Sequence, residues 1–424
     1  MYNENLPDIV EIRELPIFVE TFDTWFWRKF KEVAHLQLHK KFFGINDNLE
    51  ANKSTGSSNR GRATRFIYKL TRRFHSEKFI LFLEKKQLKS LSQHQVTKRC
   101  LDFLREDHPN FLFFTHQRPP YVVPMVVAAN ELEIGTGSFI FSWDNLASKG
   151  RMAANFDHYL VWSDLMKNEL LYFYPETAVQ NVKVVGTPQF EPYILDRYKT
   201  IKEDFYYRFA LDPVLKTICY SCGDISTSRN DELYIGTIAA AIEKGEILES
   251  VNLLVRTSPA EEIDRFENLK QRFPFISWNY PNWAVSRKDH PEIWSQRVPS
   301  EQDLKDLSAI LQFSHIGINM CSTMSLDFMI FDKPVINPVF GNEENGLYND
   351  QRFLNYDHYK KVVESGAVKI AKDKEELMFD INFYLSNPGS DTKERRELLN
   401  LEIGMPLEGT SRRIAKSLRK FLEE

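Results

Sequence analysis

Residues 314–338, SHIGINMCSTMSLDFMIFDKPVINP, hold the pattern that decides the fold. Residues 314–320 alternate like a strand, and residues 333–338 are typical of a turn followed by a second, buried strand. Between these two runs, residues 326–331 have the length and composition of a short helix. The segment therefore predicts a strand–turn–helix–strand unit.

Hydroxyl side chains gather at the start of this short helix. The first turn of a helix presents free backbone N–H groups and the positive end of the helix dipole, which together favour a phosphate group. Ser322, Thr323 and Ser325 add hydroxyl donors. Asp327, one turn later, has the position to accept a hydrogen bond from a sugar hydroxyl. Simple N-capping by Ser322 or Thr323 is the alternative, and the pattern leaves both interpretations open.

The length and composition of the chain restrict its class. A chain of 424 residues exceeds what one hydrophobic core usually organises, which predicts two domains. Charged residues at 27% and hydrophobic residues at 42% describe an ordinary globular protein, and no apolar run is long enough to span a membrane. The N-terminus has no signal-peptide pattern, and four cysteines are too few for a disulfide framework. We therefore expect a cytoplasmic protein.

Strands alternate with helices along most of the chain. This alternation predicts an α/β protein with mostly parallel sheets that are covered on both faces. We place an N-terminal domain at residues 1–206 and a C-terminal domain at residues 207–424, with the strand ends of both around one cleft. The expected strands are residues 110–115, 137–142, 158–162, 182–185, 216–221 and 252–256, and the expected helices are residues 121–132, 164–173, 232–244 and 410–422.

A polar loop directly follows one of the predicted strands. Residues 142–150, SWDNLASKG, bring the carboxylate of Asp144, the amide of Asn145 and the amine of Lys149 together beside Trp143. Loops after parallel strands lie at the carboxyl edge of a sheet, so we expect these groups at the cleft. There Asp144 would act as a general base toward an acceptor hydroxyl. The alternative is a turn in which Asp144 or Asn145 bonds its own backbone.

His116 is the second candidate for a catalytic base. It follows the strand predicted at residues 110–115 and is expected at the same edge of the sheet as the polar loop. A purely structural histidine is the alternative, and the sequence does not decide between the two.

Residues 60–99 form a basic segment in a chain whose net charge is −4. They contain twelve Lys or Arg residues against two Glu, and Phe66, Phe74 and Phe79 are interleaved with the cations. Part of the segment, residues 63–74, is typical of an amphipathic basic helix, for which a solvated helix face is the alternative. An anionic membrane surface or an anionic acceptor would match the charge. No nucleic-acid-binding motif is present and the chain is acidic overall, so we expect no nucleic acid partner.

Several segments together resemble a known family. Residues 143–149 are similar to the Trp-His-Gly…Lys loop of the CDP-glycerol glycerophosphotransferases, with Asp144 in place of the family's histidine base. Residues 185–190, VGTPQF, resemble the family's Gly-x-Pro-Arg-x-Asp segment without its Arg and Asp. Residues 322–327 with 333–336 resemble the loop and strand that bind the nucleotide phosphates.

A further segment extends the match to roughly residues 105–340. Residues 255–259, VRTSP, are similar to a strand end that usually reads Arg-Pro-His-Pro in these proteins. The resemblance is to nucleotide-sugar glycosyltransferases of the GT-B type, in which two Rossmann-like domains face a cleft. It implies that the final helix, residues 410–424, returns to the first domain, and that Arg256 or Ser258 binds the donor diphosphate.

The resemblance implies an enzyme of bacterial surface-polysaccharide biosynthesis. Such a glycosyltransferase moves a sugar from a nucleotide-sugar donor, bound by the C-terminal domain, to a glycan or lipid-linked acceptor on the N-terminal domain. It would work in the cytoplasm or peripherally on the inner face of the membrane. No Asp-x-Asp pair is present to hold a bridging metal, so we expect a metal-independent enzyme without a cofactor.

Two alternatives to this function stay open. A non-hydrolysing nucleotide-sugar epimerase shares the two-domain layout. A catalytically degenerate scaffold or binding subunit is favoured somewhat by the Arg and His residues that the family motifs lack here.

Overall fold

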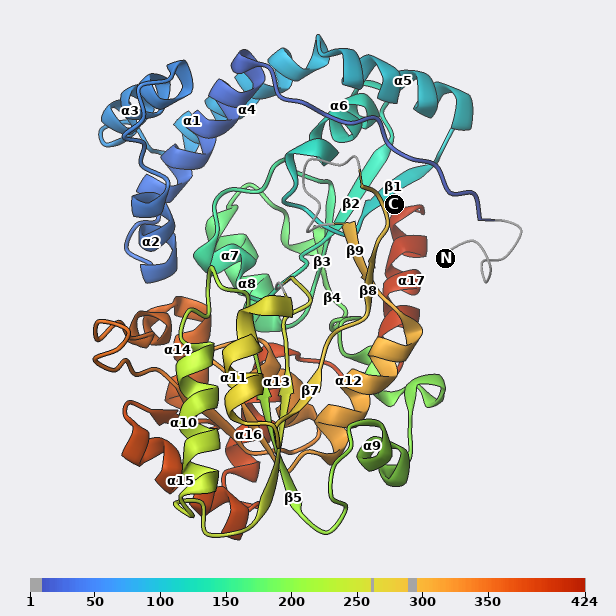
Figure 1. The fold of residues 1–424 in the computed structure, drawn as a ribbon. Coiled ribbons are helices and arrows are strands. Elements are labelled where there is room, and N and C mark those ends of the chain that lie inside the picture. Colours follow the sequence, from blue (N-terminus) through green and yellow to red (C-terminus); the bar gives the residue numbers. More distant parts are fainter. Residues whose placement is uncertain (1–9, 261–262, 289–295, 424) are drawn as a thin grey trace.

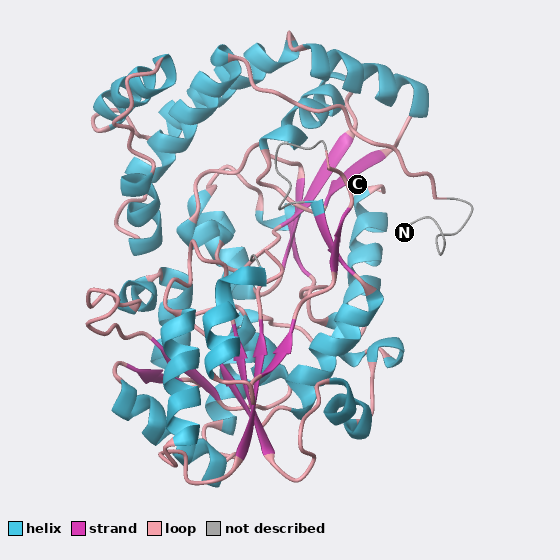
Figure 2. Ribbon diagram, in the orientation of Figure 1, coloured by secondary structure: helices cyan, strands magenta, loops and turns pink. Residues whose placement is uncertain are grey.

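The computed structural model describes residues 10–260, 263–288 and 296–423. Two parallel β-sheets, one above the other in the view of Figures 1 and 2, are each covered by helices. The carboxyl ends of both sheets contribute to one inter-domain cavity. The predicted α/β fold with two Rossmann-like domains facing a cleft is therefore confirmed.

The sheet of the first domain is parallel and has the order β1–β2–β3–β4 in the described residues. Each strand overlaps one predicted from the sequence. Its helices α6 (Val123–Glu131) and α8 (Asp164–Phe173) connect successive strands, as parallel pairing requires. The strands are β1 (Phe111–Phe114), β2 (Gly135–Phe139), β3 (His158–Val161) and β4 (Val182–Val184), and the short helix α7 (Asn145–Ser148) follows β2.

Helices precede the first strand and form an arch above the first sheet, drawn in blue in Figure 1. We call them the helical arch: α1 (Phe22–Leu38), α2 (Phe43–Ala51), α3 (Asn59–Thr71), α4 (Glu77–Ser92) and α5 (Gln95–Asp107). Their starts are set by N-caps, since Thr21, Ser58 and Ser76 each accept a hydrogen bond from an amide of the first turn. The arch is held to the domain by buried apolar side chains such as Val33 and Leu83.

The second sheet is parallel and has the order β12–β11–β10–β5–β6–β7 in the described residues. The chain runs from β5 outward to β6 and β7 and then returns to the other side of β5, so the strand order reverses between β5 and β10. Open α/β sheets bind ligands outside the carboxyl ends of the strands at such a switch point. The strands are β5 (Lys216–Ser221), β6 (Val251–Arg256), β7 (Ser277–Asn279), β10 (Ile316–Ile318), β11 (Val335–Pro338) and β12 (Lys369–Ala371).

Helices surround the second sheet, and a short antiparallel pair of strands extends from this domain toward the first sheet in Figure 1. The pair is β8 (Trp283–Val285) with β9 (Arg297–Pro299). The helices are α9 (Lys202–Arg208), α10 (Asp231–Glu243), α11 (Glu267–Arg272), α12 (Glu301–Phe313), α13 (Met324–Ile330), α14 (Asp357–Ser365), α15 (Lys374–Ser386) and α16 (Thr392–Glu402).

The last helix, α17 (Thr410–Phe421), packs on the first domain. The ring of Phe421 stacks on His158 with centroids 4.1 Å apart and lies 6.0 Å from the ring of Phe111. At the other end of the helix, Arg413 Nε donates to the carbonyl oxygen of Val185 at 2.9 Å. The C-terminal helix therefore links the second domain to the first.

Replacing Phe421 with Ala is expected to lower the free energy of unfolding by about 3–5 kcal/mol, because the substitution removes a buried ring from the contact between α17 and the first sheet. Denaturant titration followed by circular dichroism measures the loss. Leu422→Ala is the control, since Leu422 is 54% exposed. Equal losses in the two variants would show that α17 does not depend on the Phe421 contact.

Candidate active site between the domains

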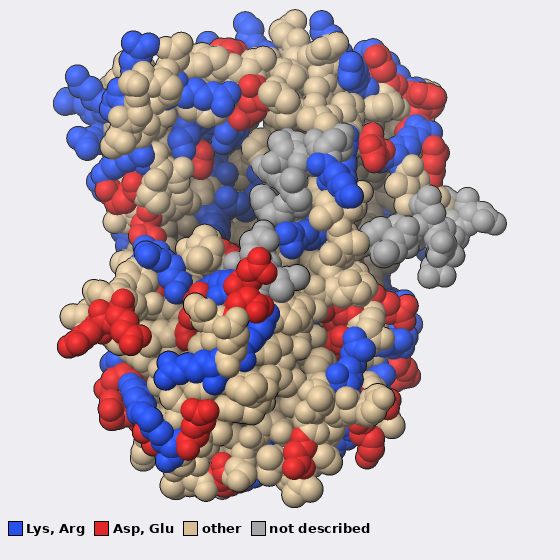
Figure 3. Space-filling model, in the orientation of Figure 1, with Lys and Arg blue, Asp and Glu red and all other residues tan. Residues whose placement is uncertain are grey.

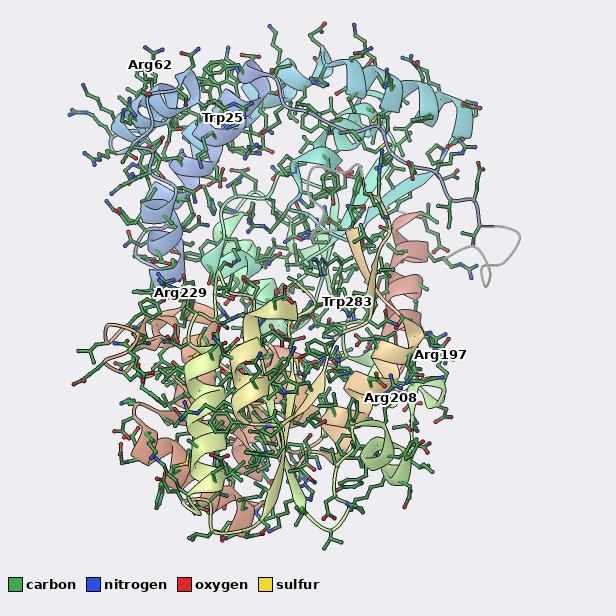
Figure 4. All side chains as sticks on the ribbon, in the orientation of Figure 1. Trp25, Arg62, Arg197, Arg208, Arg229 and Trp283 are labelled. Atoms are coloured by element: carbon green, nitrogen blue, oxygen red, sulfur yellow. The ribbon has the colours of Figure 1, made fainter. Side chains whose placement is uncertain are left out.

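A cavity of about 500 Å³ lies between the domains. The first domain contributes the loop after β2, and the second contributes the loops after β5, β6 and β10, so the β5–β10 switch point opens into it. Trp283 of β8 closes one side and is labelled in Figure 4 between the two sheets. Size, position and the convergence of polar side chains make this cleft the candidate active site.

A larger hollow, of about 810 Å³, lies between α9 and α12. Figure 4 labels two of its residues, Arg197 and Arg208, at the side of the molecule and away from the strand ends. The guanidinium of Arg208 is already paired with Asp306, with NH2 donating to Oδ2 at 2.7 Å. The hollow lies away from the carboxyl ends of both sheets, so the inter-domain cleft is the better candidate.

Asp144 lines the cleft, and its carboxylate is held on two sides. Lys149 Nζ lies 3.2 Å from Oδ2, and Asn145 Nδ2 donates to Oδ1 at 2.9 Å. Burial raises the pKa of Asp144, but the nearby Lys149 and His358 and hydrogen bonds to the carboxylate outweigh it and lower the pKa to about 2. Asp144 is thus ionised at neutral pH, which a general base requires.

Two residues predicted to face an acceptor make contacts within the protein, and of the two Trp143 lines the cleft. Asn145 is buried, and its Oδ1 accepts a hydrogen bond from Gln117 Nε2 at 2.9 Å, so the amide orients Asp144. Trp143 is 4% exposed and donates from Nε1 to Thr323 Oγ1 at 3.1 Å, which joins the two domains. The acceptor-side roles of Asn145 and Trp143 stay predictions, and the indole N–H of Trp143 is committed to Thr323.

His116 does not line the cleft. Its ring stacks on Phe141 with centroids 4.7 Å apart, and its Nδ1 accepts a hydrogen bond from the Arg118 amide at 3.2 Å. Burial lowers the pKa of His116 to about 4, and the charge of Arg118 acts in the same direction. The structure therefore favours the structural interpretation of His116.

His358 is a cleft residue that sequence reasoning missed. It lies in the first turn of α14, its Nδ1 is 2.9 Å from Ser148 Oγ, and its ring centroid is 5.1 Å from that of Trp143. Burial lowers its pKa to about 4, so the imidazole is neutral at pH 7. Asp144 and His358 thus face the same cavity from different domains. The sequence near residue 358 is aromatic and polar, but nothing in it points to residue 144.

Ser322 and Thr323, at the start of α13, line the cleft. The Ser322 hydroxyl accepts from the Met324 amide at 3.2 Å, a local turn contact, while Thr323 is the N-cap residue of α13 and makes no side-chain capping hydrogen bond. Because both hydroxyls act as acceptors in their protein contacts, their protons remain for a ligand. Cys321, just before them, has a φ of 46°, a left-handed conformation that is costly for a residue with a side chain and recurs at binding sites.

Ser325 and Asp327 face the interior, which corrects the prediction that they bind the donor. Ser325 Oγ donates to Asn319 Oδ1 at 3.1 Å and lies 2.9 Å from the hydroxyl of Tyr359. Asp327 is 3% exposed and accepts a hydrogen bond from Tyr193. The short helix packs this face against the rest of the protein, so neither side chain reaches a ligand in the cleft.

Arg256 lines the cleft, but its charge is already neutralised. Its NH2 donates to Asp303 Oδ2 at 2.9 Å, its NH1 donates to Asn279, and the residue is 5% exposed. A buried guanidinium paired with a carboxylate is a poor anchor for a diphosphate, because breaking the pair would leave an uncompensated charge. Ser258, in the loop after β6, also lines the cleft and is the better candidate of the two.

Comparisons with solved structures agree with this architecture. A candidate UDP-N-acetylglucosamine 2-epimerase from Listeria monocytogenes matches with a TM-score of 0.51 and 10% identity over 80% of each chain. The Staphylococcus aureus MnaA–UDP complex matches with a TM-score of 0.50 and 11% identity over 94% of each chain. The wall teichoic acid polymerase TagF matches less well, with a TM-score of 0.46, 12% identity and coverage of 74% of this chain and 73% of that chain.

No family model matches the sequence, and the search of curated proteins gave no match. At these identities the structural likeness shows the fold. The chain has the GT-B-type architecture of nucleotide-sugar enzymes that the sequence resemblance implied.

Asp327 makes stability depend on pH. Burial raises its pKa from 3.8 to about 7, so the folded state keeps a proton that the unfolded state releases. Its contribution to stability is full below about pH 4 and is lost as the pH rises to about 7. Asp327→Asn, which can still accept from Tyr193, removes this dependence. We expect the Tm of the variant minus that of the wild type to be larger at pH 8 than at pH 5.

Differential scanning calorimetry at the two pH values measures this difference. Asp102→Asn is the control, because the side chain of Asp102 is 78% exposed. A Tm difference for Asp327→Asn that is equal at both pH values would contradict the protonated, buried carboxyl.

Proposed function

We propose that the protein is a metal-independent glycosyltransferase that moves a sugar from a nucleotide-activated donor to a glycan or lipid-linked acceptor of a bacterial surface polysaccharide. The observation that supports this most is the convergence of two kinds of group at one cleft. The first domain contributes the ionised carboxylate of Asp144, and the second contributes the hydroxyls of Ser322 and Thr323 at the strand-order switch point. A transfer reaction needs a base for the acceptor and a binding site for the donor, and here separate domains supply them.

The donor would bind at the second domain. Ser258, Ser322 and Thr323 offer hydroxyl protons around the carboxyl ends of β6 and β10, where a diphosphate is expected in this fold. Arg256 stays with Asp303 and does not take part. Lys149, whose side chain is 44% exposed at the opposite wall of the cleft, is the cation available to the leaving diphosphate.

The ion pair of Asp144 with Lys149 would couple departure of the diphosphate to deprotonation of the acceptor hydroxyl. As long as Lys149 stays at 3.2 Å, the pKa of Asp144 near 2 makes the carboxylate a weak base. When Lys149 turns to the diphosphate, that pKa rises and Asp144 becomes a better acceptor for the proton of the attacking hydroxyl. The new glycosidic bond forms as the bond to the diphosphate breaks, and the diphosphate leaves with the electron pair. His358, beside Asp144, would position the acceptor hydroxyl.

The outer surface of the helical arch supports a membrane-proximal acceptor. Figure 3 shows Lys and Arg side chains gathered over the part of the arch where α3 lies, and Arg62 points outward there in Figure 4. Exposed phenylalanines lie among these cations. The ring of Phe79 lies between two of these phenylalanines, with its centroid 6.1 Å from that of Phe74 and 6.2 Å from that of Phe82. We call this the basic–aromatic surface. It comprises Arg62, Arg65, Phe66, Lys69, Arg72, Arg73, Phe74, Lys78, Phe82, Lys85 and Lys86.

We propose that the basic–aromatic surface contacts an anionic leaflet. Each cation near such a surface contributes about 1 kcal/mol, and the exposed rings can enter the headgroup region. Among the helices of the described ranges, none has both the length and the apolar character to cross a bilayer.

Asp144→Asn is expected to bind donor normally and to lose about 10²–10⁴-fold in transfer rate, because the base is removed while its shape is kept. Release of nucleoside diphosphate from a panel of nucleotide sugars, with a membrane fraction as acceptor source, measures the rate. His116→Gln is the control and should stay near the wild-type rate. Activity that survives Asp144→Asn but not His116→Gln would reverse the assignment of the base.

Incubation of the wild type with each donor alone separates the alternative functions. Slow hydrolysis without an epimer is the expected result for a transferase. Formation of an epimer would identify an epimerase, and complete inertness toward every donor, with or without acceptor, would identify a scaffold.

Vesicle co-sedimentation tests the basic–aromatic surface. Binding is expected to anionic vesicles, to be weak with zwitterionic vesicles, and to be lost at high salt, because exposed charges are screened. Arg72→Glu with Arg73→Glu should weaken binding without changing nucleotide affinity. Lys393→Glu with Arg396→Glu, at exposed positions of α16, makes the same charge change on the second domain and should have no effect. Equal binding to both kinds of vesicle would show that the basic–aromatic surface is a solvated helix surface and not a site for anionic lipid.

A further inference from the structure

Among the described residues, no carboxylate pairs with the guanidinium group of Arg118. Arg118 lies in the loop after β1, and its NH1 group is buried with no hydrogen-bond partner in the part of the chain that the structure describes. An arginine cannot release its proton to avoid this cost, so the buried donors need an acceptor from elsewhere. This is a feature of a site for an anion rather than of a packed core.

The loop that carries Arg118 is tied to the loop that carries Asp144. The side chain of Gln117, the residue before Arg118, accepts a hydrogen bond from the Phe141 amide at 3.3 Å and donates to Asn145 Oδ1 at 2.9 Å. The charges of both Arg118 and Asp144 act on the imidazole of His116. Arg118 therefore lies at the same edge of the first sheet as the candidate base, in the domain assigned to the acceptor.

Two further cations, Lys31 of α1 and Arg151, lie in the same part of the first domain. Arg151 stands over the ring of Tyr174 at 4.6 Å, and the charge of Arg118 reaches the hydroxyl of the same tyrosine. Lys31 is 2% exposed, and its Nζ donates to the backbone oxygen of Ala153 at 3.0 Å. Burial lowers the pKa of Lys31 to about 8, which still leaves the amine mostly charged at neutral pH.

The carboxylates in this region contact the other cations and not Arg118. Glu77 and Glu84 both pair with Arg151, at 2.7 and 3.7 Å, and Glu84 and Glu32 act on Lys31. Arg118 has no such partner in the described part of the chain, so its guanidinium group is left for a ligand. Figure 3 shows Lys and Arg side chains inside the hollow that separates the helical arch from the middle of the molecule. An anion that enters this hollow comes close to these Lys and Arg side chains.

We propose that Arg118 binds a phosphate group of the acceptor, in the recess between the helical arch and the loops after β1 and β2. This rests on the proposed function and adds to it the chemical class of the acceptor, a phosphorylated glycan or lipid. Phosphate is favoured over carboxylate because a phosphate group carries up to about two negative charges where a carboxylate carries one, and the hollow holds more than one cation. The donor diphosphate belongs to the opposite wall of the cleft, at the switch point of the second sheet.

Titration calorimetry with inorganic phosphate tests the proposal, and acetate serves as the carboxylate probe. The donor side is silenced in one series with Ser322→Ala and Thr323→Ala, so that phosphate bound there is not counted. Phosphate is expected to bind wild type and the silenced protein, and Arg118→Gln is expected to weaken it about tenfold or more in both. Arg99→Gln, at an exposed position of α5, is the matched control and should bind as the wild type does.

Arg118→Lys keeps the charge but loses the paired N–H donors of the guanidinium, so its affinity for phosphate should be intermediate. This variant keeps the test available if Arg118→Gln is unstable. Phosphate should also raise the Tm of the wild type and not that of Arg118→Gln. Unchanged phosphate binding in Arg118→Gln, or none in the wild type, would overturn the site, and acetate binding as tight as phosphate would overturn the ligand class. Nucleotide affinity is unaffected by Arg118→Gln in this account. A failure of nucleotides to bind would therefore contradict the proposed function alone.

Discussion

The hydrogen bond from Trp143 Nε1 to Thr323 Oγ1 crosses between the domains, and the candidate site depends on it. It fixes the loop after β2 against the start of α13, so the carboxylate of one domain and the hydroxyls of the other face one cavity. The contact between Ser148 and His358 reinforces the same alignment. A single neutral hydrogen bond contributes only about 0.5–1.5 kcal/mol. The alignment of the domains therefore also needs the aromatic packing of Trp143 against His358 and Tyr359.

Charge in the cleft is distributed unevenly between paired and available groups. Arg256 and Asp303 neutralise each other at the end of β6, which keeps a buried cation without presenting it to a ligand. Asp144 and Lys149 form the opposite case, because both reach the cavity and Lys149 is half exposed. A buried pair mainly organises its surroundings, whereas an exposed pair can exchange partners during a reaction. Reactivity is thus expected at the loop after β2 rather than at the end of β6.

Much of this arrangement was predictable from sequence. The strand β5 and the helix α8 have the predicted bounds, because the residue pattern within each segment is enough to define it. Asp144, Ser258 and Ser322 reach the cleft because each follows a strand of a parallel sheet. This reasoning uses only local pattern and the geometry common to α/β folds.

The errors arise where long-range packing decides. Asp327 turns inward because the face of a short helix is set by its neighbours, here Tyr193, which is 134 residues away. Arg256 loses its free charge to Asp303, and His358 reaches Ser148 across 210 residues. None of these pairings can be predicted from a local sequence pattern.

Binding of a nucleoside diphosphate in the inter-domain cleft, at the β5–β10 switch point, can be measured by titration calorimetry of the wild type with UDP, CDP, GDP and dTDP, repeated with the Ser322→Ala/Thr323→Ala variant. We expect at least one nucleotide to bind the wild type. The double variant should lose about 1–3 kcal/mol of binding free energy, the scale of hydrogen bonds to charged groups. Absence of binding by every nucleotide, or equal affinity in the wild type and the double variant, would contradict nucleotide binding at the switch point.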